Sequence, residues 1–230
     1  MQHIIQLTLP MSSGFSETFI HPIVLQDAEN LILVDCGYVG CLGLLEAELK
    51  RHGITFDQLT GLVLTHHDHD HMGTAAALKR ANPRMLVYAS SMEAVYISAK
   101  EKPQRLVQAE KLQETLPIEQ QAFGEMFCSM LRRIEPVEVD VLLSEAQLLP
   151  WCGGTQVLLT AGHTPGHISL FVPSACAVIV GDAFALEDNL PVLANPQFTL
   201  DMQLADQSME KLLSLKAMTY YCYHGGIFLS

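Results

Sequence analysis

Histidine and aspartate side chains crowd one short segment of the chain. Four of the ten histidines lie within six residues, in the run Thr65-His66-His67-Asp68-His69-Asp70-His71. Imidazole and carboxylate groups together suit Zn, Fe or Mn. The run directly follows a predicted buried strand at residues 61–64, and a loop that leaves a strand can aim several side chains at one point. We therefore predict a metal site here rather than a solvated polar loop.

Three further motifs present groups of the same kind. A tight turn with the sequence Gly-His-Thr-Pro-Gly-His carries His163 and His167 just after a predicted strand. Asp182 sits at the end of another predicted buried strand, where sheet proteins often place ligand-binding groups. His224 leaves the last predicted strand beside two glycines, which allow close backbone approach. Each motif is weak alone, but their order and spacing together are specific.

The elements that must position these residues are strands and helices in alternating blocks. Apolar runs bounded by turn-forming residues predict strands, and apolar residues at helical spacing predict helices. The predicted strands are 4–9, 20–25, 31–34, 61–64, 85–88, 137–141, 156–160, 168–172, 177–180 and 219–223, followed by a short tail. The predicted helices are 41–51, 73–81, two or three segments within 90–133, and 202–216. This order favours an α/β or α+β fold.

The sequence predicts one domain that spans residues 1–230. No linker rich in Pro, Gly or Ser and no repeat of fixed period divides it. A helical insertion is expected at about 90–133, broken at Pro103 and Pro117. Its apolar side chains could line a substrate pocket, although packing within the insertion explains them equally well. These side chains belong to Tyr96, Ile97, Phe123, Met126, Phe127 and Met130.

From residue 33 to residue 226 the sequence resembles the metallo-β-lactamase superfamily. The matching motifs are Val34-Asp35-Cys36-Gly37, the His-rich run from Thr65 to Gly73, Gly162 to His167, Gly181-Asp182 and Tyr223 to Gly225. The resemblance implies a four-layer αββα sandwich with both metals at one edge. Within the superfamily it resembles hydrolases of the glyoxalase II and lactonase type. Because the sequence shows no counterpart of the glyoxalase II C-terminal substrate-binding region, we expect a short, stand-alone hydrolase.

The second motif of that superfamily, His-x-His-x-Asp-His, departs here at one position. Starting it at His66 places the final Asp-His pair on Asp70 and His71 but puts Asp68 where the second histidine should be. A competing register through His67, His69 and His71 has even spacing but loses the Asp-His pair. We prefer the first register, in which His67 and His69 are not ligands.

Carried over by position, the resemblance implies a complete ligand set for two divalent ions. One ion would be held by His66, Asp68 and His163, the other by Asp70, His71 and His224, with Asp182 bridging. Asp35 and His167 would support the site without binding metal. We expect both ions to be zinc. Iron and manganese are alternatives, because Asp68 adds a hard oxygen donor to the first site.

The implied chemistry is metal-dependent hydrolysis. Metal coordination lowers the pKa of water from about 15.7 towards about 7, so a metal-bound hydroxide would be the nucleophile, with Asp70 accepting or relaying a proton. We expect an ester, lactone, thioester or amide-type small molecule as the substrate. Two alternatives remain: an iron-dependent oxidoreductase on the same fold, or a divergent metal-binding protein without turnover.

Composition limits the partners. Thirteen Lys and Arg against 25 Asp and Glu give a net charge of −12, which makes nucleic acids and anionic membranes poor partners. The predicted catalytic loops also lack local Arg or Lys to hold a phosphate. No signal peptide or run of about 18 apolar residues is recognisable, so we expect a cytoplasmic protein. A homodimer is compatible with the sequence.

Overall fold

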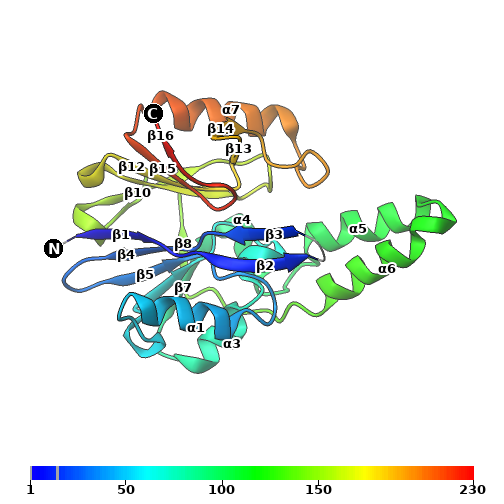
Figure 1. The fold of residues 1–230 in the computed structure, drawn as a ribbon, viewed down its shortest axis with the longest axis horizontal. Helices are drawn as coiled ribbons and strands as arrows, with labels where there is room; N and C mark the ends of the chain where they lie inside the picture. Colours follow the sequence, from blue (N-terminus) through cyan, green and yellow to red (C-terminus); the bar gives the residue numbers. More distant parts are fainter. Residues whose placement is uncertain (1, 14–15) are drawn as a thin grey trace.

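The computed structural model describes residues 2–13 and 16–230 and contains two six-stranded sheets packed face to face (Figure 1). The first sheet has the order β1 (His3–Gln6), β4 (Ile23–Gln26), β5 (Leu31–Val34), β6 (Gly61–Val63), β7 (Leu86–Ser90) and β8 (Val141–Leu143). The second has the order β16 (Gly226–Leu229), β15 (Thr219–Cys222), β12 (Ala177–Gly181), β11 (Ile168–Val172), β10 (Thr155–Leu159) and β9 (Leu148–Leu149). Two small hairpins pair β2 (Leu9–Ser13) with β3 (Ser16–Ile20) and β13 (Ala185–Glu187) with β14 (Leu190–Val192).

Helices cover the outer face of each sheet. In Figure 1, α1 (Leu42–Arg51) and α3 (Ala75–Ala81) lie against the first sheet, and α7 (Met202–Ser214) lies against the second. The result is the expected four-layer αββα sandwich. Among the described residues, none of the helices has the length and apolar character needed to span a bilayer.

Alternation along the strands explains why both faces of each sheet are covered. In β4, Ile23 and Leu25 pack into the core between the sheets, while Val24 packs on the helix side. In β12, Ile179 faces the inter-sheet core and Val178 faces α7. Because successive side chains point to opposite faces, a strand buried on both faces reads as a continuous apolar run.

The N-terminal strands differ from the prediction. The runs at 4–9 and 20–25 each divide, so that β1 pairs with β4 while β2 pairs with β3 in a separate hairpin. Pro22 lies at one division and has no N–H to contribute to a sheet ladder. Its carbonyl instead accepts from the Leu7 amide at the other division, 2.9 Å away.

The structure differs from the prediction at other positions as well. The strand predicted at 137–141 begins only at Val141, because the amide of Val137 donates to Ile97 rather than to a sheet partner. The predicted short tail contains β16, which pairs antiparallel with β15. A four-residue helix, α2 (His69–Met72), lies within the His-rich run ahead of α3.

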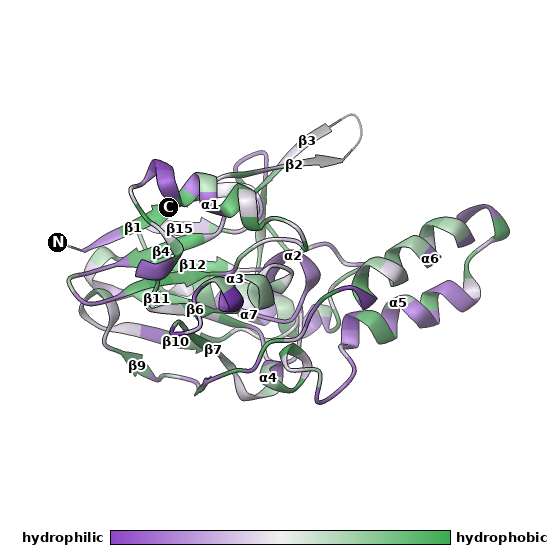
Figure 2. Ribbon diagram, turned by 90° about the horizontal axis from the view of Figure 1, so that it is seen from below, coloured by the Kyte–Doolittle hydropathy of each residue, from purple (hydrophilic) through white to green (hydrophobic). Residues whose placement is uncertain are grey.

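The segment predicted as a helical insertion forms α4 (Ser91–Ile97), α5 (Gln104–Thr115) and α6 (Ile118–Arg132). Pro103 and Pro117 occupy the N-cap positions of α5 and α6, so both breaks fall where the prolines predict them. Helices α5 and α6 form a hairpin that projects from the sandwich, with hydrophilic and hydrophobic stretches interleaved along it (Figure 2).

Strand direction brings the predicted motifs to one edge of the sandwich. β5 and β6 are parallel neighbours in one sheet, and β12 and β15 are parallel neighbours in the other. Parallel neighbours end at the same edge, which is where loops carry ligand-binding groups. The loops after these four strands carry Asp35, the His-rich run, Asp182 and His224.

Candidate metal centre

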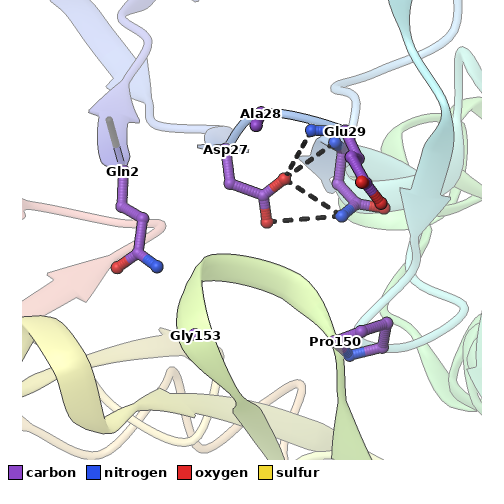
Figure 3. Close-up of a pocket in the computed structure, with 7 residues that line it drawn as sticks. Gln2, Asp27, Ala28, Glu29, Pro150 and Gly153 are labelled. Carbon is purple, nitrogen blue, oxygen red and sulfur yellow. Dashed lines mark hydrogen bonds between the residues drawn. The ribbon is translucent and has the colours of Figure 1, made fainter.

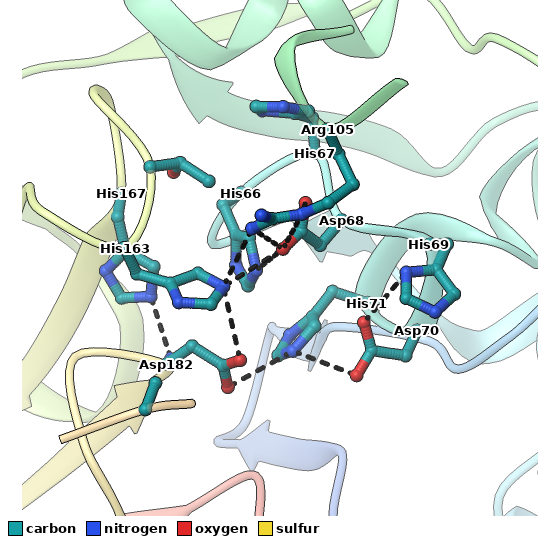
Figure 4. Close-up of polar contacts among 12 residues, drawn as sticks. His66, His67, Asp68, His69, Asp70, His71, Arg105, His163, His167 and Asp182 are labelled. Atoms are coloured by element: carbon teal, nitrogen blue, oxygen red, sulfur yellow. Dashed lines mark hydrogen bonds and ion pairs between the residues drawn. The ribbon is translucent and has the colours of Figure 1, made fainter. Parts of the chain in front are cut away.

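The structure gathers the seven predicted ligands into three overlapping groups. Figure 4 labels all of them except His224. Each group offers ligand atoms that lie within 4.8 Å of one another. The groups are His66, Asp68 and His163; His66, His71 and Asp182; and Asp70, His71 and His224. Asp182 Oδ2 lies 3.5 Å from His163 Nε2, and Asp182 Oδ1 lies 3.6 Å from His224 Nε2. Asp182 therefore lies between the first and the third group, at the position of a bridging residue.

Asp35 orients two of the histidines without entering any of the three groups. Its Oδ2 accepts hydrogen bonds from His71 Nδ1 and Thr65 Oγ1, both at 2.8 Å. Since the Thr65 hydroxyl donates to Asp35, it accepts from His66 Nδ1 at 2.9 Å. Both imidazoles therefore carry their proton on Nδ1, and both Nε2 atoms are free to bind a cation.

His167 lies beside the centre with both ring nitrogens hydrogen-bonded to other groups. Its Nε2 accepts from the Asp182 amide at 2.8 Å, and its Nδ1 lies 2.8 Å from Thr160 Oγ1. Both ring nitrogens are thus engaged, and neither is available to a metal. Gly181 permits this approach, because a Cβ at that position would lie 2.6 Å from His167 Nε2.

The competing register through His67, His69 and His71 is not assembled. His67 Nδ1 lies 2.5 Å from Glu93 Oε2, so its imidazole faces α4 rather than the other ligands. His69 instead packs edge-on against Phe127, with ring centroids 5.7 Å apart.

Sequence reasoning missed Glu93, a buried carboxylate that ties two motif loops together. In addition to its contact with His67, its Oε1 accepts from Thr164 Oγ1 at 2.7 Å and from the Gly166 amide at 2.8 Å. The position at the start of a helix gives no sequence signal for this role.

Sequence reasoning placed Tyr223 in the last motif but assigned it no role. Its hydroxyl donates to the Asp70 carbonyl at 2.5 Å, and its ring lies on the His71 ring with centroids 3.9 Å apart. This tyrosine immediately precedes His224 and therefore fixes the last motif against the second one.

Arg105 is a basic residue beside the catalytic loops that the sequence of the loops could not reveal. It comes from the first turn of α5, and its Nε and Nη2 donate to both carboxylate oxygens of Asp68 at 2.6 to 3.2 Å. The two side chains are only 3% and 5% exposed. The loops do lack local basic residues, but tertiary packing supplies one from 37 residues away.

The electrostatics of the centre favour ionised carboxylates. Burial alone would raise the pKa of Asp182, but His71 and His224 outweigh it and hold that pKa well below its usual value. Asp70 behaves in the same way beside His71 and His69. For Asp68, the Arg105 guanidinium and His163 overcome the effect of burial and lower the pKa strongly.

The donor set fits a divalent cation. His66 Nε2, His71 Nε2 and Asp182 Oδ1 are buried, and none has a hydrogen-bond partner among the described residues. A buried polar atom without a partner is costly, and a bound cation would satisfy all three. Imidazole nitrogens and carboxylate oxygens are ligands of Zn, Fe and Mn.

A cavity of about 680 Å³ opens onto these groups. Asp68, Asp70, His163, Asp182 and His224 line its floor. The remaining lining residues mix apolar and polar groups: Tyr38, His69, Ala185, Glu187, Val192, Leu193, Ala194, Asn195, Pro196 and Phe198. Phe127 lies at its margin, with its ring centroid 6.0 Å from that of Phe198.

A second, smaller cavity of about 310 Å³ lies at the opposite end of β5, beside the turn that joins β4 to β5 (Figure 3). None of the predicted ligands lines it. Asp27 organises this turn by accepting from the amides of Glu29 and Asn30 at 2.9 and 2.8 Å. It also accepts from the Cys152 amide at 2.8 Å, which links the two sheets.

Comparison with known proteins places this centre in a family. The sequence pattern of the metallo-β-lactamase superfamily matches residues 17–224, which include all seven predicted ligands. The chain belongs to the metallo-β-lactamase superfamily. This membership confirms the family and the fold class that the motifs predicted. It also confirms the predicted class of enzyme, which is a hydrolase of this superfamily.

Individual members of the superfamily show the extent of the similarity. The chain is 28% identical over 217 residues to the probable metallo-hydrolase YflN of Bacillus subtilis (strain 168), covering 86% of this chain and 76% of that protein. A metallo-β-lactamase family protein from Thermus thermophilus superposes with a TM-score of 0.77 at 22% identity, covering 98% of this chain and 74% of that one. An archaeal superfamily protein from Sulfolobus tokodaii gives 0.70 at 18% identity, covering 100% and 82%. At these identities, the two solved structures establish the fold alone.

Proposed function

We propose that this chain is a metal-dependent hydrolase of small molecules that carry an ester, lactone, thioester or amide bond. The observation that carries the proposal is a cluster in which the buried, unpartnered Nε2 atoms of His66 and His71 lie beside ionised carboxylates, of which Asp68, Asp70 and Asp182 line the 680 Å³ cavity. The ligands would be His66, Asp68, Asp70, His71, His163, Asp182 and His224. When bound, two divalent ions, which we expect to be zinc, would activate water and polarise the scissile carbonyl.

The residues of the chain have distinct parts in this proposal. Asp70 lines the cavity as an ionised carboxylate and can accept a proton there. Burial and the nearby Asp70 and Asp182 raise the pKa of the Tyr38 hydroxyl, so that Tyr38 stays a hydrogen-bond donor at the cavity wall. Asp35 and Tyr223 keep His71 in place.

The lining supports an uncharged or weakly polar substrate. No lysine or arginine is among the residues that line the cavity in the described part of the chain. Arg105 lies just behind the lining, but its guanidinium is already bound to Asp68 and Gln108. A phosphodiester would therefore meet carboxylates without a free cationic side chain, which argues against nucleotides.

The test combines a metal count with a substrate screen. The protein is purified without chelator or added metal, its metals are measured by inductively coupled plasma mass spectrometry, and turnover is assayed on esters, lactones, thioesters and amides. We expect turnover that disappears on chelation, returns with zinc, and is lost in His71→Ala. His52→Ala, a histidine change at the C-terminal end of α1, serves as the matched control.

The other outcomes decide against the proposal. Normal turnover after complete metal removal would show that hydrolysis does not need the centre. Iron content with oxygen uptake would favour the oxidoreductase. Full metal loading without turnover on any of the four bond types would indicate a metal-binding protein without this activity.

A further inference from the structure

The two ends of the metal centre differ in charge because of Arg105. Apart from the bridging Asp182, which lies between both ends, the end formed by Asp70, His71 and His224 carries one negative charge, that of Asp70. The end formed by His66, Asp68 and His163 carries one, and the guanidinium of Arg105 neutralises it. A divalent cation therefore meets very different electrostatic potentials at the two ends.

The guanidinium also donates a hydrogen bond to the carboxylate oxygen of Asp68 that a metal would need as a ligand. Asp68 Oδ2 lies 3.0 Å from His163 Nε2 and 3.6 Å from His66 Nε2, which makes it the carboxylate oxygen shared by this end of the centre. The same oxygen accepts from Arg105 Nη2 at 2.6 Å. Arg105 Nη2 is also only 3.5 Å from His163 Nε2, so a positive group already lies beside two of the three ligand atoms.

Packing holds Arg105 in this position. Its Nη1 donates to Gln108 Oε1 at 2.5 Å, one turn further along α5. Gln108 in turn donates to the carbonyl of Gln197 at 3.1 Å, and the ring of the next residue, Phe198, lies over the guanidinium with its centroid 5.2 Å from Cζ. Because the guanidinium is buried and each of its three nitrogens already donates a hydrogen bond, it is not free to bind a substrate anion.

We infer that Arg105 makes metal loading ordered: the first ion binds at Asp70, His71, Asp182 and His224, and the guanidinium weakens binding of a second ion at His66, Asp68 and His163. Arg105 is thus a positioning residue that sets the number of ions bound at a given metal concentration. This inference rests on the proposed metal dependence, but it concerns metal occupancy rather than hydrolysis.

The experiment is a calorimetric titration of the chelator-stripped full chain with zinc alone. For the wild type we expect one tight site and a second that is weaker by roughly 100-fold. A difference of this size corresponds to about twice the free energy of a tenfold change, which lies within the Coulomb energy of a buried unit charge close to a dication. Arg105→Met should bring the second site within about tenfold of the first. Arg105→Lys, which keeps the charge, should keep the wild-type difference.

Three matched variants assign the sites. Arg132→Met removes a positive charge from the same hairpin, where Arg132 pairs with Glu110 and Glu125 at the surface, and should leave both affinities unchanged. His163→Ala should retain the tight site and lose the weak one. His224→Ala should lose the tight site.

Two equally tight sites in the wild type would overturn the inference, as would loss of the tight site in His163→Ala. These outcomes do not require Arg105→Met to fold, because they come from the wild type and the histidine variants. They are also distinct from failure of the proposed function, since no substrate is present. A chain that loads zinc in order but hydrolyses nothing would keep this inference and lose the other.

Discussion

At the scale of single residues, the centre depends on side chains that do not themselves face the cavity. Asp35 adopts a left-handed backbone conformation with φ of 60° and directs its carboxylate at Thr65 and His71. Left-handed geometry in a residue other than glycine costs energy, and it persists where the surroundings fix it. The hydrogen bond to His71 sets which ring nitrogen remains free for a cation.

Asp35→Asn should therefore weaken metal binding. The amide can still accept a hydrogen bond, but the negative charge that polarises His71 is lost, and such supporting changes cost about 10- to 100-fold in affinity. Competition with a chromogenic zinc chelator measures the change. Asp57→Asn, at an exposed position between α1 and β6, is the control, and equal affinities in the two variants would contradict the role of Asp35.

Asp27 predicts a pH dependence of stability that is independent of the metal centre. Burial would raise its pKa, but the amides of Glu29, Cys152 and Asn30 outweigh burial and lower it below the usual value. A carboxylate whose folded pKa is lowered stabilises the fold above its unfolded pKa of about 3.9, and this stabilisation is lost as the pH falls through the folded pKa.

For Asp27→Asn we expect a loss of about 1 kcal/mol in the free energy of unfolding at pH 7. Urea unfolding at a series of pH values should show that the difference from the wild type is constant down to about pH 5 and narrows below about pH 4. Glu29→Gln removes a charge from the same turn without removing these hydrogen bonds and serves as the control. A difference that widens in acid would refute the assignment.

At the scale of elements, α6 presents two neighbouring apolar side chains to different surroundings. Phe127 packs against His69 and Phe198 at the margin of the cavity, whereas Met126 is 61% exposed. The sequence alone gives no basis for separating them, because both fit a lid and both fit simple packing. Their positions in the structure favour Phe127 alone as a determinant of substrate choice.

Phe127→Ala should alter the relative kcat/KM values for small and bulky acyl groups by about tenfold, since one side-chain contact in a pocket is worth about 1–3 kcal/mol. Met126→Ala should leave them unchanged and shift the free energy of unfolding by no more than about 0.5 kcal/mol. The measurement is a substrate series assayed with both variants. Unchanged relative rates in Phe127→Ala, together with a large fall in melting temperature, would assign Phe127 to packing.

The elements also show how far sequence reasoning extends. The motif loops could be predicted because each follows an apolar strand, and strand ends are where such residues gather. The division of the first strands at Pro22 was missed, because the apolar runs continue across it. Arg105 was missed for a different reason: its approach to Asp68 depends on the direction in which α5 leaves the sandwich, and no local pattern encodes that direction.

At the scale of the whole molecule, bound metal should contribute to stability. A ligand that binds only the folded state at 100 times its dissociation constant adds about 2.7 kcal/mol, and for a chain of this size each kcal/mol shifts the melting temperature by about 2–4 °C. Stripping the metal should therefore lower the melting temperature by roughly 5–10 °C, and zinc should restore it. Differential scanning calorimetry measures this shift, and no change on stripping would argue that the centre is empty in the purified protein.

The placement of His224 also bears on how the chain folds. The other six predicted ligands lie between residues 66 and 182, while His224 follows β15, which joins the sheet beside β12. That parallel pairing joins segments about forty residues apart, with α7 between them in the chain, so it is a long-range contact of the kind that forms slowly. As the chain emerges from a ribosome, cations can meet the earlier ligands first, but the coordination sphere closes only when the last strand docks. Completion of the metal sites would then be the last step that stabilises the folded chain.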